Sequence, residues 1–327
     1  MDTRGMHMIV IRKYGNKPAG KKIAFSTNET VQNDFSESQK HTSQLNCYDL
    51  IGDVHGYMDL LDSLVEKMGY SRKGKGYEHP EGRKLIFVGD LINRGPDSIS
   101  VLKTVRETWE QGNALLTLGN HEFNLLQDAK MNKPLPNQGY QSYLSWLEKI
   151  PLFLDLEDLR VVHAAWHFPS ISFLSQMQVP HDEIIRKSCD KSSPERKAVD
   201  LILKGVKAKL PTTPCLHDRF GETRTKGRLR WWENLEGKPF SKALFSPMYG
   251  NAIEEFPKAQ DIRQLEPYPT DEKPVFTGHY CLEPHIEKIN GNIACLDGCV
   301  TYDKILWGYR HTSGWKLAKE NLIYSEY

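Results

Sequence analysis

The sequence predicts an α/β fold in which short buried strands alternate with amphipathic helices around one core. Five apolar runs each end on a polar side chain, and a helical pattern follows the first two runs. With 327 residues and 39% hydrophobic content, the chain can bury a core of that size. We therefore expect one large α/β domain.

The first unit comprises a strand, a polar loop and a helix. The strand is expected over Tyr48–Ile51, the loop begins at Gly52-Asp53, and the helix ends before Gly69. Apolar side chains lie on one face of this helix at Leu60, Leu61, Leu64, Val65 and Met68. Their spacing is that of an amphipathic helix packed on a sheet.

The same order returns in a second unit, and three more apolar runs follow. A strand over Lys84–Val88 ends at Gly89-Asp90, and a helix then includes Val101 and Val105. The three later runs and the polar residues they reach are Leu115–Leu118 with Asn120, Leu159–Val162 with His163, and Val275–Phe276 with His279. Every run thus delivers a polar side chain to a strand end.

The regions outside these units divide the chain. Residues 1–46 are poor in large apolar groups from Asn16 onward, so we expect a flexible leader, followed by a single domain over 47–327. Periodicity weakens between Ser170 and Pro274, which predicts an insertion or cap, 170–274, over the site. No apolar stretch reaches membrane length. The sequence leaves the oligomeric state open.

Charge and cysteine content limit the classes of partner. The 43 basic and 42 acidic residues give a net charge of +1, so charge indicates neither nucleic acid nor a membrane surface as the partner. The six cysteines form no CxxC pair, and we expect reduced thiols in a cytoplasmic protein. Attraction for an anion must then be local.

The polar strand ends are the candidate site. Ligands bind beyond the carboxyl ends of strands in α/β sheets, so these side chains are expected to meet at one edge. They are Asp53, His55, Asp90, Asn120, His163 and His279. Carboxylate, imidazole and amide ligands without thiolate suit manganese, iron, zinc, cobalt or nickel. Two ions need a bridging ligand, for which Asp90 is the candidate.

The motifs at these strand ends resemble a known family. They read Gly52-Asp53-Val54-His55-Gly56, Gly89-Asp90-Leu91-Ile92-Asn93-Arg94-Gly95-Pro96, Gly119-Asn120-His121-Glu122, Val162-His163-Ala164 and Gly278-His279. In this order they resemble calcineurin-like metallophosphoesterases, in the branch of serine/threonine protein phosphatases and bacterial symmetrical dinucleoside tetraphosphatases. The resemblance implies a central β-sandwich flanked by helices. It also implies two divalent metals, manganese first, one held by Asp53, His55 and Asp90 and the other by Asp90, Asn120, His163 and His279.

Three further residues are candidate catalytic groups. Two ions about 3.5–4 Å apart would activate a bridging hydroxide for attack on phosphorus. Arg94 would bind nonbridging phosphate oxygens, and His121 would protonate the leaving oxygen. Many relatives have Asp where this chain has Asn93, and an amide brings no charge to orient the histidine. This departure favours a non-protein substrate.

The basic segment Arg219–Trp232 leaves two alternatives open. Its five basic residues and two tryptophans could form a second phosphate clamp or a base-stacking wall, with Arg228 and Arg230 as candidate substrate-binding residues. Alternatively, it is a solvated basic face whose tryptophans lie in the core of the insertion. The nearly neutral net charge favours the second reading.

These observations predict a two-metal phosphohydrolase that cleaves a phosphomonoester or a nucleotide phosphoanhydride, similar to bis(5'-nucleosyl)-tetraphosphatases. A serine/threonine protein phosphatase is the alternative, so the partner is a phosphorylated small molecule or a phosphoprotein. An alternative from another class is a catalytically weak metal- or phosphate-binding module. The complete set of ligands, together with Arg94 and His121, argues against that last possibility.

Overall fold

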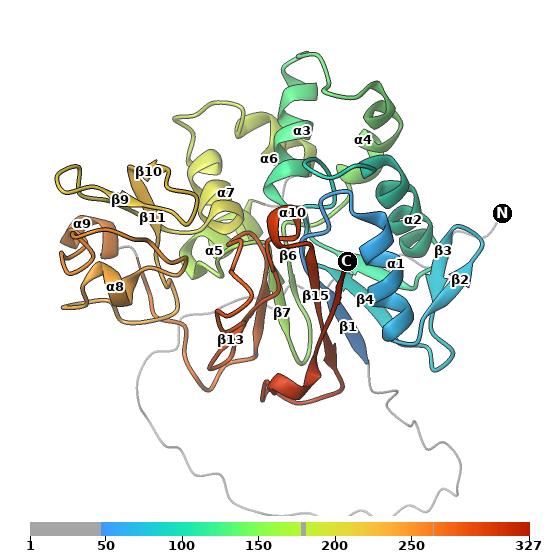
Figure 1. Cartoon of the computed structure of the whole chain (residues 1–327). Coiled ribbons are helices and arrows are strands. Elements are labelled where there is room, and N and C mark those ends of the chain that lie inside the picture. The colour runs from blue at the N-terminus through green and yellow to red at the C-terminus, as the bar shows by residue number, and fades with distance from the viewer. Residues whose placement is uncertain (1–46, 178–180, 264) are drawn as a thin grey trace, which may run out of the picture. The chain divides into compact units, whose positions relative to one another are not determined.

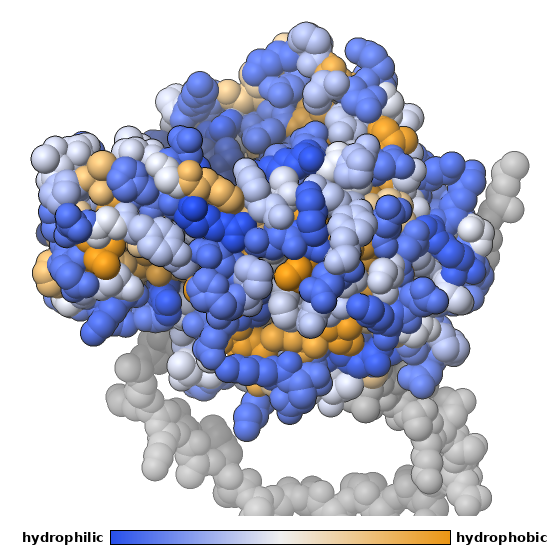
Figure 2. Space-filling view, in the orientation of Figure 1, coloured by the Kyte–Doolittle hydropathy of each residue, from blue (hydrophilic) through white to orange (hydrophobic). Residues whose placement is uncertain are grey.

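A computed structural model describes residues 47–177, 181–263 and 265–327. The predicted leader, 1–46, lies outside the described residues. Residues Asn46–Tyr327 form one compact unit. Hydrophilic side chains dominate the face of this unit seen in Figure 2. Among the helices of the described ranges, none combines the length and the hydropathy that a membrane span requires.

The first of two five-stranded sheets contains the first three predicted strands. Its strand order is β16 (Leu322–Glu326), β15 (Ile305–His311), β1 (Tyr48–Ile51), β4 (Lys84–Phe87) and β5 (Ala114–Leu116). Strands β1, β4 and β5 are parallel, with Tyr48 opposite Lys84. Their carboxyl ends therefore lie on the same edge, where Asp53, Asp90 and Asn120 follow.

The second sheet contains the other two predicted strands. Its order is β13 (Ile289–Asn290), β14 (Ile293–Cys295), β12 (Val275–Thr277), β7 (Arg160–Val162) and β6 (Phe153–Asp155). Strands β7, β12 and β14 are parallel, so His163 and His279 follow neighbouring strands at one edge. Figure 1 shows the strands of both sheets in the centre of the unit.

The two sheets pack face to face around a core of their own. Leu50 and Ile86 from the first sheet pack with Val161 and Phe276 from the second, and all four are fully buried. This burial of apolar faces against each other holds the layers together. The predicted central β-sandwich is confirmed.

Helices cover the first sheet on its other face. Helix α1 (Met58–Lys67) packs on β15 and β16, and α2 (Ser98–Glu110) packs on β5. The carboxylate of Asp97 accepts a hydrogen bond from the Ser100 N–H at 2.9 Å and so caps α2. Helix α3 (Asn120–Lys130) begins at a predicted site residue. The remaining elements of this half are β2 (Ser71–Lys73), β3 (Gly76–Glu78), α4 (Leu144–Leu147) and a 3₁₀-helix (Gln138–Tyr143).

The predicted insertion, 170–274, holds short helices and strands. They are most of α5 (Phe168–Gln176), α6 (His181–Lys187), α7 (Pro194–Lys204), β8 (Lys207–Lys209), β9 (Leu216–His217), β10 (Thr223–Arg224), β11 (Lys226–Arg228), α8 (Phe240–Ala243) and α9 (Ala259–Ile262). The elements from β9 to α9 form the yellow and orange lobe beside the sandwich in Figure 1. After β14 come α10 (Val300–Asp303) and a 3₁₀-helix (Lys319–Asn321).

The expectation that all cysteines are reduced is wrong at one pair. Cys281 and Cys299 form a disulfide, while Cys295, four positions before Cys299, is free and buried. The carboxylate of Asp297 accepts hydrogen bonds from the N–H groups of Cys281 at 2.7 Å and Cys299 at 2.8 Å. These bonds bring together two loops that sequence spacing could not relate.

Candidate metal centre

Asp90 lies at the centre of the predicted site and faces three histidines. Its Oδ2 atom is 3.3 Å from His163 Nε2, 3.7 Å from His55 Nε2 and 3.9 Å from His121 Nε2. Asp90 and the first two histidines are buried. The structure thus places a carboxylate from β4 between imidazoles that follow β1 and β7.

The other three predicted ligands join this group. Asn120 Oδ1 is 3.3 Å from His163 Nε2, and Asp53 Oδ2 accepts a hydrogen bond from the His279 N–H at 3.0 Å. His279 also offers a ring nitrogen within 4.8 Å of the donor atoms of Asp90 and His163. All six side chains that the sequence placed at strand ends therefore lie together.

Two histidines are oriented as metal ligands usually are. His55 Nδ1 lies 3.0 Å from the Ile92 carbonyl oxygen, and His163 Nδ1 lies 2.9 Å from that of Val88. A carbonyl only accepts, so each Nδ1 carries a hydrogen and each Nε2 faces Asp90. His279 differs, because its Nε2 accepts a hydrogen bond from Arg228 Nε at 3.0 Å.

The backbone is strained where the site residues sit. Among the described residues, nine non-glycine residues have a positive φ. Five of them are predicted site residues: His55, Asp90, Asn93, Arg94 and His279. Each such conformation costs on the order of 1–3 kcal/mol and persists where the surrounding structure enforces it. This clustering is typical of a functional site.

One carboxylate oxygen in the centre lacks a partner among the described residues. Asp53 Oδ1 is buried and accepts no hydrogen bond from that part of the chain. A Cβ at position 278 would lie 1.9 Å from this atom, so Gly278 is required for the close approach. A buried, unsatisfied carboxylate oxygen beside imidazoles and an amide fits a divalent cation. The described residues thus provide the donor set that metal ions would need.

The electrostatics of the group follow from its burial. Burial, with the charges of Asp297 and Asp90, raises the pKa of Asp53 well above its usual range. Burial also raises the pKa of Asp90, but His163 and the other histidines outweigh it and hold this pKa well below the usual range. Burial lowers the pKa of His163, but the charge and hydrogen bond of Asp90 outweigh burial and raise this pKa to about 10. A cation that binds there would replace a proton.

Asn93 and His121 are hydrogen-bonded to each other at the edge of the centre. The Tyr140 hydroxyl donates to Asn93 Oδ1 at 3.3 Å, which turns the amide nitrogen toward His121 Nδ1 at 3.0 Å. The amide nitrogen only donates, so His121 Nδ1 accepts and Nε2 carries the hydrogen, toward Asp90. Burial lowers the pKa of His121 to about 4, although Asp90 opposes this shift.

The three predicted arginines have different surroundings. Arg94 Nη1 lies 3.5 Å from His55 Nε2, and Arg228 contacts His279, so these two flank the centre. Arg230 is not brought to the site: its Nε donates to the Leu244 carbonyl, and its Nη1 pairs with Glu233 at 3.4 Å. Arg230 lies beyond β11, which ends at Arg228, and its contacts with Leu244 and Glu233 hold its guanidinium there, so its role in substrate binding stays a prediction.

The tryptophans of the basic segment lie in a core. Trp231 and Trp232 are buried, with 3% and 8% of their surface exposed. Trp232 packs edge-on against Phe245, with ring centroids 4.7 Å apart. These rings offer no face to a base, so the base-stacking alternative is wrong and the packing alternative holds for both tryptophans.

Glu122 positions two loops of the site, and the sequence analysis did not predict this role. Its buried carboxylate accepts hydrogen bonds from four backbone N–H groups, at 2.8–3.1 Å. The donors are Asp90, Leu91, Ile92 and Gly119. Glu122 thereby ties the loop after β4 to the start of α3. The motif around Asn120 contains it, but acidic residues are common in any first helical turn.

Replacing Glu122 by Ala should destabilise the fold through this loop. The change leaves four buried donors without their acceptor, so we expect the free energy of unfolding to fall by about 3–5 kcal/mol. Urea unfolding followed by circular dichroism measures it. Glu122→Gln retains one carbonyl oxygen and should lose less, whereas Glu254→Ala, at an exposed position, should change little. Equal stability of all three variants would contradict the positioning role.

The chain matches a known family over most of its length. The family described as calcineurin-like phosphoesterase matches residues 49–281. The curated relatives include the bis(5'-nucleosyl)-tetraphosphatase PrpE [asymmetrical] of Oceanobacillus iheyensis, 33% identical over 36% of this chain and 54% of the relative. The protein of that name from Bacillus subtilis is 38% identical over 32% of this chain and 42% of the relative.

The matches to these relatives are partial. The chain spans about half of their length or less, and their names specify asymmetrical enzymes, whereas the motif resemblance above was to symmetrical ones. Among solved structures, a cold-active protein-tyrosine phosphatase of a Shewanella species is 14% identical, with a TM-score of 0.46 over 85% of this chain and 82% of that one. Because the family match covers more than half of the chain and includes its site motifs, this protein belongs to the calcineurin-like phosphoesterase family.

Proposed function

We propose that the protein is a metal-dependent phosphohydrolase that cleaves nucleotide phosphoanhydrides, with a dinucleoside tetraphosphate as the first candidate substrate. One observation carries the proposal: six side chains with oxygen and nitrogen donors converge, and Asp53 Oδ1 among them is buried without a partner in the described ranges. Family membership and the names of the relatives support the reaction class and the substrate.

In this proposal, Asp90 serves two divalent ions. Asp53 and His55 complete one site, and the other site consists of Asn120, His163 and His279. Divalent ions at these sites would lower the pKa of an attacking water and offset negative charge that develops on the phosphate. Manganese as the ion and the cytoplasm as the location remain predictions.

The chain's own residues would bind and orient the phosphate. Arg94 on the His55 side and Arg228 on the His279 side would donate to nonbridging oxygens from opposite flanks. His121 would present its Nε2 hydrogen to the leaving oxygen. Arg228 belongs to the 170–274 segment, which supports our proposal that this segment acts as a cap over the centre.

A serine/threonine protein phosphatase remains the second candidate. The absence of a carboxylate at Asn93 speaks against it, because the leaving serine or threonine oxygen needs a proton more than a phosphate does. A nucleotide leaves as a phosphate anion, which needs a proton less than the oxygen of serine or threonine does. A catalytically weak binding module predicts metal or phosphate binding with negligible turnover.

Comparing three substrates under one set of conditions tests these candidates. Diadenosine tetraphosphate, p-nitrophenyl phosphate and a phosphopeptide would each be incubated with manganese and with a chelator. We expect the tetraphosphate to give the highest kcat/KM, and the chelator to abolish turnover of all three. A preference for the phosphopeptide would favour the second candidate, and no turnover with any added metal would leave only the binding module.

A further inference from the structure

Two short strands near the metal centre place like charges opposite each other. Strands β8 and β11 are antiparallel, with Lys207 opposite Arg228 and Lys209 opposite Lys226. Lys209 and Lys226 are exposed, whereas Lys207 and Arg228 are partly buried. Like charges directly opposite each other destabilise a strand pair, and burial strengthens the effect. Lys207 and Arg228, called the inner pair below, therefore reduce the stability of the free protein.

Within the described ranges, neither cation of this inner pair forms a direct ion pair. Within the part of the chain that the structure describes, neither Lys207 nor Arg228 has a carboxylate within 4.0 Å. Asp200, on the neighbouring α7, is already paired with Arg196 and Lys204, at 2.8 Å each. By contrast, the buried Arg83 of the sandwich pairs with Asp49 at 2.7 Å.

The surroundings of Lys207 disfavour its charged form, although Asp200 partly opposes this effect. Burial, with the charges of Arg228 and Lys204, lowers the pKa of Lys207 to about 8. Buried cations are normally paired with an anion, so two adjacent unpaired ones indicate a place for an anionic ligand.

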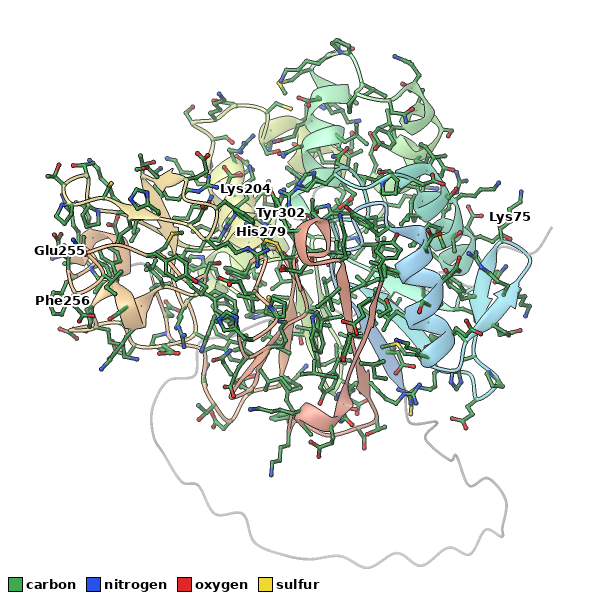
Figure 3. All side chains as sticks on the ribbon, viewed as in Figure 1. Lys75, Lys204, Glu255, Phe256, His279 and Tyr302 are labelled. Atoms are coloured by element: carbon green, nitrogen blue, oxygen red, sulfur yellow. A yellow bond between two sulfur atoms is a disulfide. The ribbon has the colours of Figure 1, made fainter. Side chains whose placement is uncertain are left out.

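Within the inner pair, Arg228 lies next to the metal centre and Lys207 lies beyond it. Arg228 Nε donates to His279 Nε2 at 3.0 Å, and Lys207 is the cross-strand neighbour of Arg228. Lys207 is thus one side chain further from the centre than Arg228. Figure 3 shows Phe256 far out on the lobe, well away from His279.

We propose that Lys207, together with Arg228, forms a second phosphate subsite that binds the phosphate next to the one being hydrolysed. The subsite makes the enzyme select chains of linked phosphates over phosphomonoesters, because a monoester has no second phosphate to place there. This inference rests on the proposed function, for which Arg228 also binds the reacting phosphate. Lys207 is then a specificity-determining residue.

The variant Lys207→Met tests the subsite, because it keeps the length of the side chain and removes the charge. We expect KM for diadenosine tetraphosphate to rise about 10- to 100-fold, the range for loss of one charged hydrogen bond. The kcat/KM for p-nitrophenyl phosphate should stay within about twofold, since that substrate leaves the subsite empty. Lys207→Arg should restore most of the affinity.

Lys209→Met is the matched control, because Lys209 lies on the same strand, also faces a cation, and is exposed. It should leave both substrates unaffected. If Lys207→Met changes both substrates equally, or neither, the subsite is refuted while the phosphohydrolase assignment stands.

If the wild-type protein hydrolyses no substrate, a binding measurement still tests the phosphate subsite independently of the proposed reaction. Calorimetric titration with inorganic tripolyphosphate and with orthophosphate requires no turnover. Tripolyphosphate should bind the wild-type protein more tightly than orthophosphate, and Lys207→Met should remove that advantage. Equal binding of tripolyphosphate by the wild type and by Lys207→Met would overturn the subsite whatever the fate of the proposed reaction.

Discussion

Asp90→Asn should abolish turnover and metal binding together. Asp90 is the carboxylate that faces His55, His163 and His121, and in the proposed function it serves both ions. Asparagine keeps the shape but removes the charge that attracts the ions. We expect kcat/KM to fall by about 10³-fold or more, given the 10²- to 10³-fold typical for one electrostatic group. Metal content after dialysis should fall in parallel.

A nearby aspartate provides the control for this substitution. Asp97 follows Asp90 by seven residues but caps α2 through the Ser100 N–H. Asparagine caps helices about as well as aspartate, so Asp97→Asn should keep both metal content and activity. Full metal content in Asp90→Asn, measured by plasma emission spectrometry, would remove Asp90 from the centre.

The convergence of the six candidate ligands could be predicted because it depends on a general rule. Each residue lies in the loop or first helical turn just after a buried apolar run, and parallel strands end on one edge. The rule requires only that a polar residue follow each strand, and this order can be read from a single sequence. The β-sandwich needed the family resemblance, because apolar runs alone do not say whether five strands form one sheet or two.

The features that sequence reasoning missed depend on contacts between distant segments. Lys207 and Arg228 face each other only because β8 pairs with β11 in one register. Glu122 matters through N–H groups that lie about thirty positions earlier in the chain. Neither register nor hydrogen-bond partner leaves a local pattern in composition or periodicity. The same is true of Cys281 and Cys299, which Asp297 brings together.

The role of His121 depends on which of its ring nitrogens carries the hydrogen. Tyr140 fixes the Asn93 amide, and that amide donates to His121 Nδ1, so the hydrogen lies on Nε2. This arrangement favours the neutral imidazole, since a protonated ring would direct a second N–H at the amide nitrogen. Burial acts in the same direction and lowers the pKa of His121. The neutral ring can still stabilise a leaving oxygen by hydrogen bonding.

His121→Ala should therefore reduce kcat by about 10²- to 10³-fold, the range for loss of one hydrogen-bond donor to charge that develops on a leaving oxygen, and should retain metal. Asn93→Asp should raise the pKa of His121 by placing a negative charge at Nδ1. A higher pKa keeps the ring protonated to higher pH, so the alkaline limit of a phosphomonoester's pH–rate profile should move upward. Nucleotide substrates, whose leaving groups need less protonation, should respond less. Unchanged turnover in His121→Ala would exclude this histidine from the reaction. If Asn93→Asp acts through His121, its effect should vanish in the variant that carries both substitutions.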